Sequence, residues 1–368
     1  MSLEIYLLPE FGWSIKGQHV FGPGSVFQGF IKLNLSPDLA EKADKVRIVF
    51  HANESVYTIA RSKPLYNKQL FGSQRVILKR KTENDFDAAA QEIARPFIIQ
   101  LPMVNFPPSS NIVSEAEGIS YHTNFNLTAY LDQADGTNLL QSKKPILYMP
   151  LIETSALKNP MTFNIADNNN DENPITVKLT SLDYVPGDKI SVLLSVNNNS
   201  SSSKKNIESI TLKLYHIQTW SSQVSLSKGK INTKKLVASS STSKINMSHF
   251  NDHGIESLLE IPLDAIPSFN YSPQFTSAYQ ILISIKQRGV IWSHGTELAT
   301  IPIHIGTLGY GIHSPEKIKD YTAFRGVFDN PSELPALPVP QFLNQLEYEE
   351  ALPVYEEQTV PPYQLAVV

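Results

Sequence analysis

The sequence contains one turn-and-strand pattern twice. A Pro-Gly turn followed by a run of alternating apolar residues occurs at residues 21–35 and again at residues 184–197. Four further blocks follow the second copy in the same order as they follow the first. The matched blocks are residues 45–51 with 210–216, 95–102 with 256–263, 119–131 with 277–286, and 144–152 with 297–306. Two copies of one domain with different loop insertions produce such a pattern, so the chain is predicted to be a duplication.

The spacing between the copies changes slowly along the chain. It is 163 residues from Pro23 to Pro186, 158 from Tyr121 to Tyr279 and 152 from Pro150 to Pro302. Each block is short, rich in Val, Ile, Tyr and Phe, and bounded by Gly, Pro, Asn or Ser, which is typical of antiparallel sandwiches and not of βαβ units. We therefore predict an all-β fold of two antiparallel β-sandwiches in tandem, followed by a disordered C-terminal tail.

Composition places the domain boundaries. Ala166–Pro174 is a polar run without apolar periodicity, which indicates an interdomain connection. The Pro-rich and acidic sequence after Gly306 cannot bury enough apolar surface to fold alone. The predicted division is residues 1–152 for the first sandwich, 153–173 for the linker, 174–306 for the second sandwich and 307–368 for the extended tail.

Two local expectations concern the segments between the strands. Residues 86–94 have a helical pattern, capped by the Asn-Asp pair before it and stopped by the Arg-Pro pair after it. The Ser/Lys/Asn-rich residues 197–206, and most of residues 226–254, are expected to form mobile loops.

Charge and cysteine content exclude several classes of function. The 368 residues carry a net charge of −4, which gives no electrostatic case for nucleic-acid binding. From Asn330 onward there are six acidic residues and no Lys or Arg, so the tail is acidic. The absence of cysteine excludes disulfides, thiolate nucleophiles and cysteine-ligated zinc. Without a secretory signal pattern or an apolar run of about 18 residues, the chain is expected to be cytoplasmic.

The sequence offers no convincing catalytic or metal-binding constellation. His249 and His253 flank Asp252, but they lie in a Ser/Asn-rich stretch without a third ligand at helical spacing. The glycines that follow Ile305 do not open a helix in a βαβ unit, as a phosphate-binding loop requires. No Gly-x-Ser-x-Gly nucleophile motif occurs. We therefore expect no catalytic residue, no metal and no cofactor.

The tail carries two short motifs of the form x-Pro-x-Tyr. They lie within twelve residues of each other, at 352–355 and 360–363. WW domains bind such sequences in the polyproline II conformation, which proline pre-sets. A Pro/Tyr-containing end without a partner is the alternative interpretation, but two copies in an acidic context favour a binding function. The predicted WW-binding residues are Leu352, Pro353, Tyr355, Val360, Pro361 and Tyr363.

The tandem sandwiches, their Pro-Gly strand starts and the Pro-Tyr tail together resemble the α-arrestins, specifically the fungal arrestin-related trafficking adaptors. The resemblance covers residues 1–306 for the fold and 347–363 for the motifs. Within the body it lies in residues 21–24, 101–110, 117–125, 184–188 and 260–263 and in Tyr279.

The resemblance implies what the protein does and what it binds. The arrestin body would recognise the cytosolic tail of a plasma-membrane transporter or receptor, and the C-terminal tail would recruit a WW-domain, HECT-type ubiquitin ligase. The cargo would then be ubiquitinated, endocytosed and sorted, and the adaptor itself would be ubiquitinated. It would be cytoplasmic, recruited to the plasma membrane or endosomes through its cargo alone. No enzyme activity, cofactor or nucleic-acid partner is implied.

Two departures from the family pattern leave alternatives open. The tail is short, and neither motif begins with proline, as the full Pro-Pro-x-Tyr form does. The alternative function is an arrestin-fold endosomal sorting scaffold that works without a ligase, like the retromer subunit. A β-sandwich enzyme, such as a carbohydrate-active protein, is a third class, for which the sequence offers no catalytic group.

Two sets of basic residues are candidates for further sites. In an extended strand, Arg75, Lys79 and Lys81 would share one face with Ile77, opposite Val76 and Leu78. The resemblance implies that such a patch reads acidic or phosphorylated cargo tails. A solvated strand edge protected by charge is the alternative interpretation. The predicted ubiquitin acceptors lie in the stretch expected to be mobile, and they are Lys228, Lys230, Lys234 and Lys235.

Overall fold

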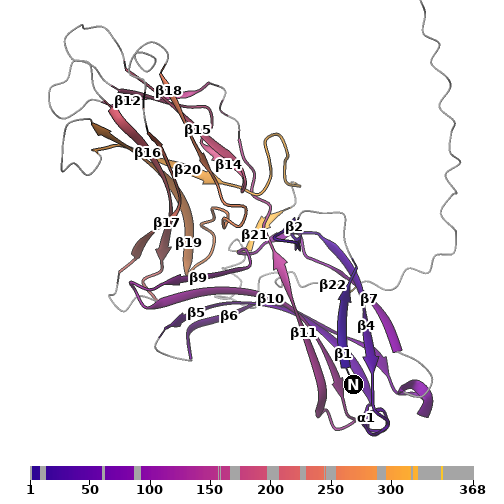
Figure 1. Ribbon diagram of the computed structural model, residues 1–368. Helices are drawn as coiled ribbons and strands as arrows, with labels where there is room; N and C mark the ends of the chain where they lie inside the picture. The colour runs from indigo at the N-terminus through magenta and orange to yellow at the C-terminus, as the bar shows by residue number, and fades with distance from the viewer. Residues whose placement is uncertain are drawn as a thin grey trace, which may run out of the picture.

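The computed structural model shows two β-sandwiches joined end to end (Figure 1). It describes residues 2–8, 14–59, 63–86, 93–155, 157, 159–165, 175–196, 207–223, 229–243, 245, 254–287, 296–315, 318–321 and 341–342. The predicted all-β tandem of antiparallel sandwiches is confirmed. Neither helical element in the described part of the chain is long and apolar enough to cross a membrane.

The first sandwich has one sheet in the order β1-β4-β7-β22 and another in the order β2-β3-β11-β10-β5-β6, with β9 added on β10. The strands of the first sheet are β1 (Ser2–Leu7), β4 (Val26–Asn34), β7 (Ile93–Gln100) and β22 (Gln341–Phe342). Those of the second sheet are β2 (Ser14–Ile15), β3 (Gln18–Phe21), β5 (Lys45–Thr58), β6 (Pro64–Lys79), β9 (Ser110–Ser114), β10 (Ile119–Asp132) and β11 (Asn138–Tyr148).

The second sandwich has sheets in the orders β12-β13-β15-β18 and β14-β20-β19-β16-β17. The strands of its first sheet are β12 (Met161–Ile165), β13 (Ile175–Leu179), β15 (Lys189–Val196) and β18 (Ile255–Glu260). Those of its second sheet are β14 (Asp183–Tyr184), β16 (Ile207–Trp220), β17 (Ile231–Ser243), β19 (Phe275–Gln287) and β20 (Thr296–Ile305).

The sheet topology bears out the duplication. The orders β1-β4-β7 and β3-β11-β10-β5-β6 of the first sandwich recur as β13-β15-β18 and β14-β20-β19-β16-β17 in the second. In both copies, the short strand before the Pro-Gly turn pairs in parallel with the last strand of the sandwich. Phe21 pairs with Tyr148 in the first copy, and Tyr184 pairs with Ile305 in the second.

The repeated Pro-Gly turn shows why both copies keep glycine. Gly24 and Gly187 have φ values of 72° and 93°, in the left-handed region that favours this residue. Each glycine N–H donates to a backbone carbonyl, that of Pro102 at 3.2 Å in the first copy and that of Ile261 at 3.0 Å in the second. A side-chain oxygen of the residue after each glycine accepts a backbone N–H at 2.9 Å in both copies, which closes the turn.

The strand register corrects two equivalences drawn from sequence spacing. The spacing matches Tyr121 with Tyr279, but counting from the parallel ladder at the end of each sandwich matches Tyr121 in β10 with Phe275 in β19. By the same count, Pro302 corresponds to Pro145 of β11 and not to Pro150, which lies after that strand. Strands of similar alternation can be aligned at several offsets, so spacing alone does not set the register.

Alternation along the central strands places one apolar face of each sheet inside. In β5, Val46, Ile48, Phe50 and Ala52 are fully buried, while the residues between them are partly exposed. Strand β16 repeats the alternation over Ile210–Trp220. Each sandwich therefore has its own core between two facing sheets.

The helical elements differ from the prediction. They are α1 (Pro37–Lys42) and one 3-10 turn, η1 (Glu83–Phe86). Of the predicted helix at 86–94, the last two residues belong to β7, and residues 87–92 lie outside the described residues. The helix α1 was missed although Ser36-Pro37 is a helix-start signal. Arg80 holds its C-terminal end by donating to the Ala43 carbonyl at 2.7 Å.

Two stretches predicted to be irregular contain strands. Residues 231–243, in the stretch expected to be a mobile loop, form β17 along the outer edge of β16. Ser, Thr and Lys are tolerated there because an edge strand has one neighbour and a solvated side. Residues 161–165 of the predicted linker form β12, which pairs with β13 of the second sandwich.

Candidate functional site

The Pro-Tyr motifs of the tail lie outside the described residues. This applies to every predicted WW-binding residue, namely Leu352, Pro353, Tyr355, Val360, Pro361 and Tyr363. Their role stays a prediction from the sequence.

The basic residues predicted as a cargo surface lie at the end of β6, an edge strand of the first sandwich. Arg75 and Lys79 belong to the strand, and Lys81 follows it. Lys79 and Lys81 are exposed, whereas Arg75 is half-buried. The backbone N–H of Lys81 donates to the Asp85 carboxylate at 2.5 Å, so Lys81 begins a turn and does not continue the strand face.

A β-bulge breaks the alternation on which the predicted surface depends. Leu78 pairs with Val46 and Val76 pairs with Arg47, so Ile77 is the extra residue. Ile77 and Leu78 both pack against the core of the first sandwich, whereas Val76 is 49% exposed. The prediction that Val76 and Leu78 share the face opposite Ile77 is therefore wrong. The predicted common face of Arg75 and Lys79 is wrong as well, because Arg75 pairs with the buried Ile48 and Lys79 pairs with Lys45.

The predicted ubiquitin acceptors are not all in loops. Lys234 and Lys235 lie in strand β17 and are paired with β16. The Lys234 ammonium also lies 4.1 Å from the centre of the Tyr215 ring, a cation–π contact. Lys230 is exposed directly before β17, and Lys228 lies outside the described residues. The loop position expected for Lys234 and Lys235 is wrong, because regular strand pairing extends over both.

The two sandwiches share a small core of their own, which we call the joint core. It consists of Val56, Ile112, Ile119 and Tyr121 from the first sandwich and Trp220, Phe269 and Phe275 from the second. The Tyr121 and Phe275 rings stack with centroids 4.7 Å apart and planes inclined by 21°. Trp220 meets Phe275 edge-on at 4.9 Å. Each such aromatic pair contributes about 0.5–1.5 kcal/mol beyond the area it buries.

A buried carboxylate lies beside the joint core. Glu54 of β5 is fully buried and accepts hydrogen bonds from three parts of the chain. Tyr121 of the first sandwich donates at 2.8 Å, and Ser272 of the second sandwich also donates. Tyr321, in the segment that follows the second sandwich, donates at 3.3 Å. Burial raises the pKa of Glu54, and the hydrogen bonds and the positive charge of Lys68 oppose that rise. One carboxylate thus links both sandwiches to the segment that follows them.

The equivalent position in the second sandwich carries no charge. Gln218 occupies the place in β16 that Glu54 occupies in β5, since each lies two residues before the partner of Tyr121 or Phe275. Gln218 is also buried, but it accepts a hydrogen bond from Thr233 of its own sandwich at 3.1 Å. The duplicated polar position is therefore used between domains in one copy and within a domain in the other.

After the second sandwich the chain turns back to the first. We call residues 306–315 and 318–321 the return segment. Thr307 Oγ1 donates to the Pro150 carbonyl at 2.7 Å and accepts the Ile152 N–H at 2.8 Å. The start of the return segment is therefore bound to the connection between the sandwiches.

The end of the return segment is bound to the first sandwich. Strand β21 (Lys319–Asp320) pairs in parallel with β8 (Val104–Asn105). Tyr321 is 1% exposed and packs against Phe106, with ring centroids 6.0 Å apart. Part of the sequence predicted as an extended tail is therefore packed against the body.

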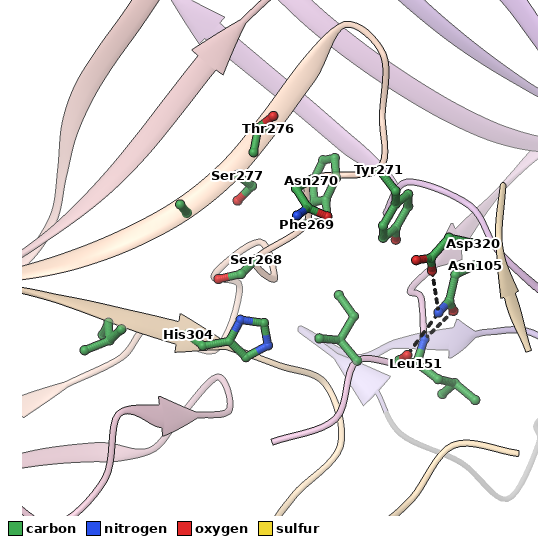
Figure 2. Close-up of a pocket in the computed structure, with 13 residues that line it drawn as sticks. Asn105, Leu151, Ser268, Phe269, Asn270, Tyr271, Thr276, Ser277, His304 and Asp320 are labelled. Carbon is green, nitrogen blue, oxygen red and sulfur yellow. Dashed lines mark hydrogen bonds between the residues drawn. The ribbon is translucent and has the colours of Figure 1, made fainter. Parts of the chain in front are cut away.

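A cavity of about 500 Å³ lies where the two sandwiches and the return segment meet (Figure 2). Asn105 of the first sandwich, His304 of the second and Asp320 of the return segment line it. The Asn105 amide donates to the Leu151 carbonyl at 3.1 Å and to Asp320 at 3.4 Å, as the dashed lines show. These bonds tie the first sandwich to the connection that follows it and to the return segment. No group of three or more metal-binding side chains occurs among the described residues.

The second sandwich is similar to a known domain family. Residues 171–310 match the family model of the arrestin (or S-antigen), C-terminal domain. The second sandwich is arrestin-like. The match covers β13 to β20 and the start of the return segment. A comparison with curated proteins gave no match. The family match, with the same topology in the first sandwich, supports an arrestin-like adaptor or scaffold, and membership of the α-arrestin subgroup stays a prediction.

The residues that join the domains were not among those predicted from the sequence. The sequence does contain a signal for Glu54, because this residue lies in the same alternation of inward-facing residues of β5 as Phe50 and Ala52. A charged residue at an inward position of a strand points to a buried partner. Tyr321 had no local signal, since its contacts lie more than two hundred residues away in the sequence.

Proposed function

We propose that the protein is an α-arrestin adaptor that links a WW-domain, HECT-type ubiquitin ligase to plasma-membrane cargo and promotes cargo ubiquitination, endocytosis and sorting. The pair of Pro-Tyr motifs behind an arrestin-like body is the observation that carries this proposal. The body would bind the cytosolic tail of a transporter or receptor, and the motifs would bind the ligase. Arrestin-family domains are non-enzymatic scaffolds, which agrees with a role in bringing partners together.

Chain geometry favours a ligase held close to the first sandwich. Strand β22 pairs with the edge of β7, which anchors the tail at Phe342. Tyr355 follows Phe342 by 13 residues. An extended residue spans at most about 3.6 Å, so Tyr355 lies within about 47 Å of that edge whatever path the chain takes. A ligase bound there would remain near any cargo bound on the body.

The candidate cargo contacts are the exposed Lys79 and Lys81, while Arg75 is half-buried on the other side of the bulge, where it pairs with Ile48. Their charges would form charge-assisted hydrogen bonds with acidic or phosphorylated cargo tails. Changing Lys79 and Lys81 to Glu is expected to stop cargo turnover in cells while WW-domain binding persists. Unchanged turnover by a folded double variant would identify this strand end as a solvated edge. Among the predicted ubiquitin acceptors that the structure describes, Lys230 lies outside a strand and is the first candidate for ubiquitination of the adaptor itself.

A binding titration of the full-length chain with WW domains of a HECT-type ligase tests the proposal. Tyr355→Ala is expected to weaken binding more than Tyr363→Ala, and the double variant is expected to lose about tenfold or more in affinity. Tyr348→Ala is the matched control, since Tyr348 lies in the same acidic stretch without a proline two residues before it. Equal binding by the double variant and the wild type would contradict the ligase link and favour the endosomal scaffold that acts without a ligase.

A further inference from the structure

Three serines are directly followed by proline, and the structure places them differently. Ser36 precedes helix α1, whose first turn contains its proline. Ser272 is buried, and its hydroxyl donates to a buried carboxylate. Ser314 lies in a segment without helix or strand, between the exposed His313 and Pro315, and is itself partly exposed. Ser36 and Ser314 are both partly exposed, but the residues that follow Ser36 are helical. Kinases bind substrate segments in extended form, so Ser314 is the one of the three that lies at the surface in a segment open to modification.

A carboxylate on the connection between the sandwiches holds Ser314. The Ser314 hydroxyl donates to Glu153 Oε1 at 2.6 Å, and the Ser314 backbone N–H donates to the same oxygen at 2.8 Å. The His313 ring lies 3.1 Å from the other carboxylate oxygen. The hydroxyl of Ser314 and the ring of His313 lower the pKa of Glu153 to about 2, so this carboxylate is ionised at physiological pH.

Ser314 lies between the two anchored ends of the return segment. Thr154, next to Glu153, donates to the Leu308 carbonyl at 2.7 Å, which fixes the start of the segment. Pairing of β21 with β8 and burial of Tyr321 fix its end. The contact with Glu153 therefore holds the middle of the return segment on the interdomain connection.

We propose that Ser314 is a phosphorylation site for a proline-directed serine/threonine kinase and that its phosphate releases the return segment from Glu153. In sequence, Pro315 follows directly and Lys317 stands three residues after the serine, the pattern that cyclin-dependent kinases favour. In the reaction, Ser314 Oγ forms a bond to the γ-phosphorus of ATP and the bond from that phosphorus to the β–γ bridging oxygen breaks. ADP leaves, and the hydroxyl proton passes to the kinase's catalytic Asp.

Phosphorylation replaces an attraction with a repulsion. The esterified Oγ has no proton to donate, and phosphoserine carries about −1.5 to −2 charges at pH 7. Next to the ionised Glu153 this charge is repelled, and the charge-assisted hydrogen bond is lost. The return segment is expected to open at Ser314 at least about tenfold more often, because a hydrogen bond to a charged group is lost.

Site mapping tests the first half of the proposal. The full-length chain is incubated with ATP and a purified cyclin-dependent kinase, and phosphate is located by mass spectrometry. Phosphate is expected on Ser314, with at least about tenfold less incorporation in Ser314→Ala. Ser36→Ala is the matched control and is expected to accept phosphate as the wild type does. Equal incorporation by Ser314→Ala and the wild type would overturn the proposal.

Hydrogen exchange tests the second half. Amide exchange over residues 306–315 is expected to be about tenfold faster in the phosphorylated chain than in the unmodified chain. In Glu153→Gln, which removes the repelling charge, phosphorylation is expected to speed exchange less. Unchanged exchange in the phosphorylated wild type, or an equal increase in Glu153→Gln, would overturn release by repulsion. Neither measurement involves the ligase, so the outcome is independent of the proposed adaptor function.

Discussion

The interiors of the two sandwiches and the joint core between them are built differently. Inside each sandwich the buried residues are mostly aliphatic and follow strand alternation, as Val46, Ile48 and Phe50 do in β5. The joint core is mostly aromatic, and the Glu54 carboxylate beside it depends on donors from three parts of the chain. An apolar interior tolerates rearrangement of many similar contacts, whereas a buried polar network depends on each partner.

The largest effect is expected inside a sandwich. Phe50→Ala removes a fully buried ring that lies 5.2 Å from the Phe71 ring, and it should lower the free energy of unfolding by about 3–5 kcal/mol. Val76→Ala, on an exposed side chain of the adjacent strand, should change it by about 0.5 kcal/mol or less. Urea unfolding of both variants provides the measurement. Similar losses in the two would show that the alternation of β5 does not define the core.

A smaller loss of stability, which also affects strand β21, is expected beside the joint core. Glu54→Ala leaves the hydroxyls of Tyr121, Ser272 and Tyr321 without their acceptor, and it should destabilise the protein by about 2 kcal/mol. It should also speed hydrogen exchange in β21, because Tyr321 loses its anchor. Gln218→Ala, at the equivalent place in the second sandwich, should leave exchange in β21 unchanged. Equal exchange of β21 in the two variants would contradict the difference between the copies.

The pH dependence of stability separates the charge of Glu54 from its hydrogen bonds. Because burial raises its pKa above the ordinary value of 4.5, the stability that Glu54 contributes is fully present below pH 4.5 and is lost as the pH rises through the folded-state pKa. Glu54→Gln keeps an acceptor but does not ionise, so its stability relative to the wild type should increase as the pH rises above 4.5.

Unfolding free energies of wild type and Glu54→Gln across pH 4 to 8 measure this difference. The buried His216, whose pKa is lowered to about 4 by burial and by Lys235, titrates in the same window but is present in both proteins, so its contribution cancels. If the difference in unfolding free energy between the two proteins stayed constant with pH, burial would not disfavour the ionised form of Glu54.

The smallest effect on stability is expected at an exposed ion pair between the two sandwiches. Lys16 of the first sandwich pairs with Asp264 of the second at 2.5 Å, with both side chains at least half exposed. A double-mutant cycle with Lys16→Ala and Asp264→Ala should give a coupling energy of about 0.5 kcal/mol that fades in high salt. A coupling as large as the effect of Glu54→Ala would show that this ion pair, and not the buried network, holds the domains together.

Strand alternation and turn chemistry made the sandwiches predictable. The Pro-Gly turns and the inward phase of β5 are local signals, and the structure follows both. The extra residue Ile77 could not be seen, since a bulge depends on the pairing partner and not on the strand's own sequence. Strand β17 was mistaken for a loop because its Ser, Thr and Lys residues occur in loops and on strand edges alike.

The candidate sites likewise include features that are visible in the sequence and features that are not. The Pro-Tyr motifs are visible in the sequence because a short linear motif carries its chemistry in adjacent residues. The links through Glu54, Ser272 and Tyr321 are not visible, since each partner lies on a separate part of the chain and becomes a neighbour only after both sandwiches fold. Ser314 falls between these cases, because the Ser-Pro pair is local but its contact with Glu153 is not.

The stacking of Tyr121 on Phe275 has a further consequence, because these residues are counterparts in the two copies. A position that meets its own counterpart lies near a two-fold axis, and such a contact is isologous. This pair therefore has the arrangement found at the centre of a symmetric dimer interface, although the Glu54 network beside it has no counterpart in the second sandwich. Opening the joint core would expose two apolar patches that fit each other, and exchange of halves between two chains is a closed assembly that would cover both.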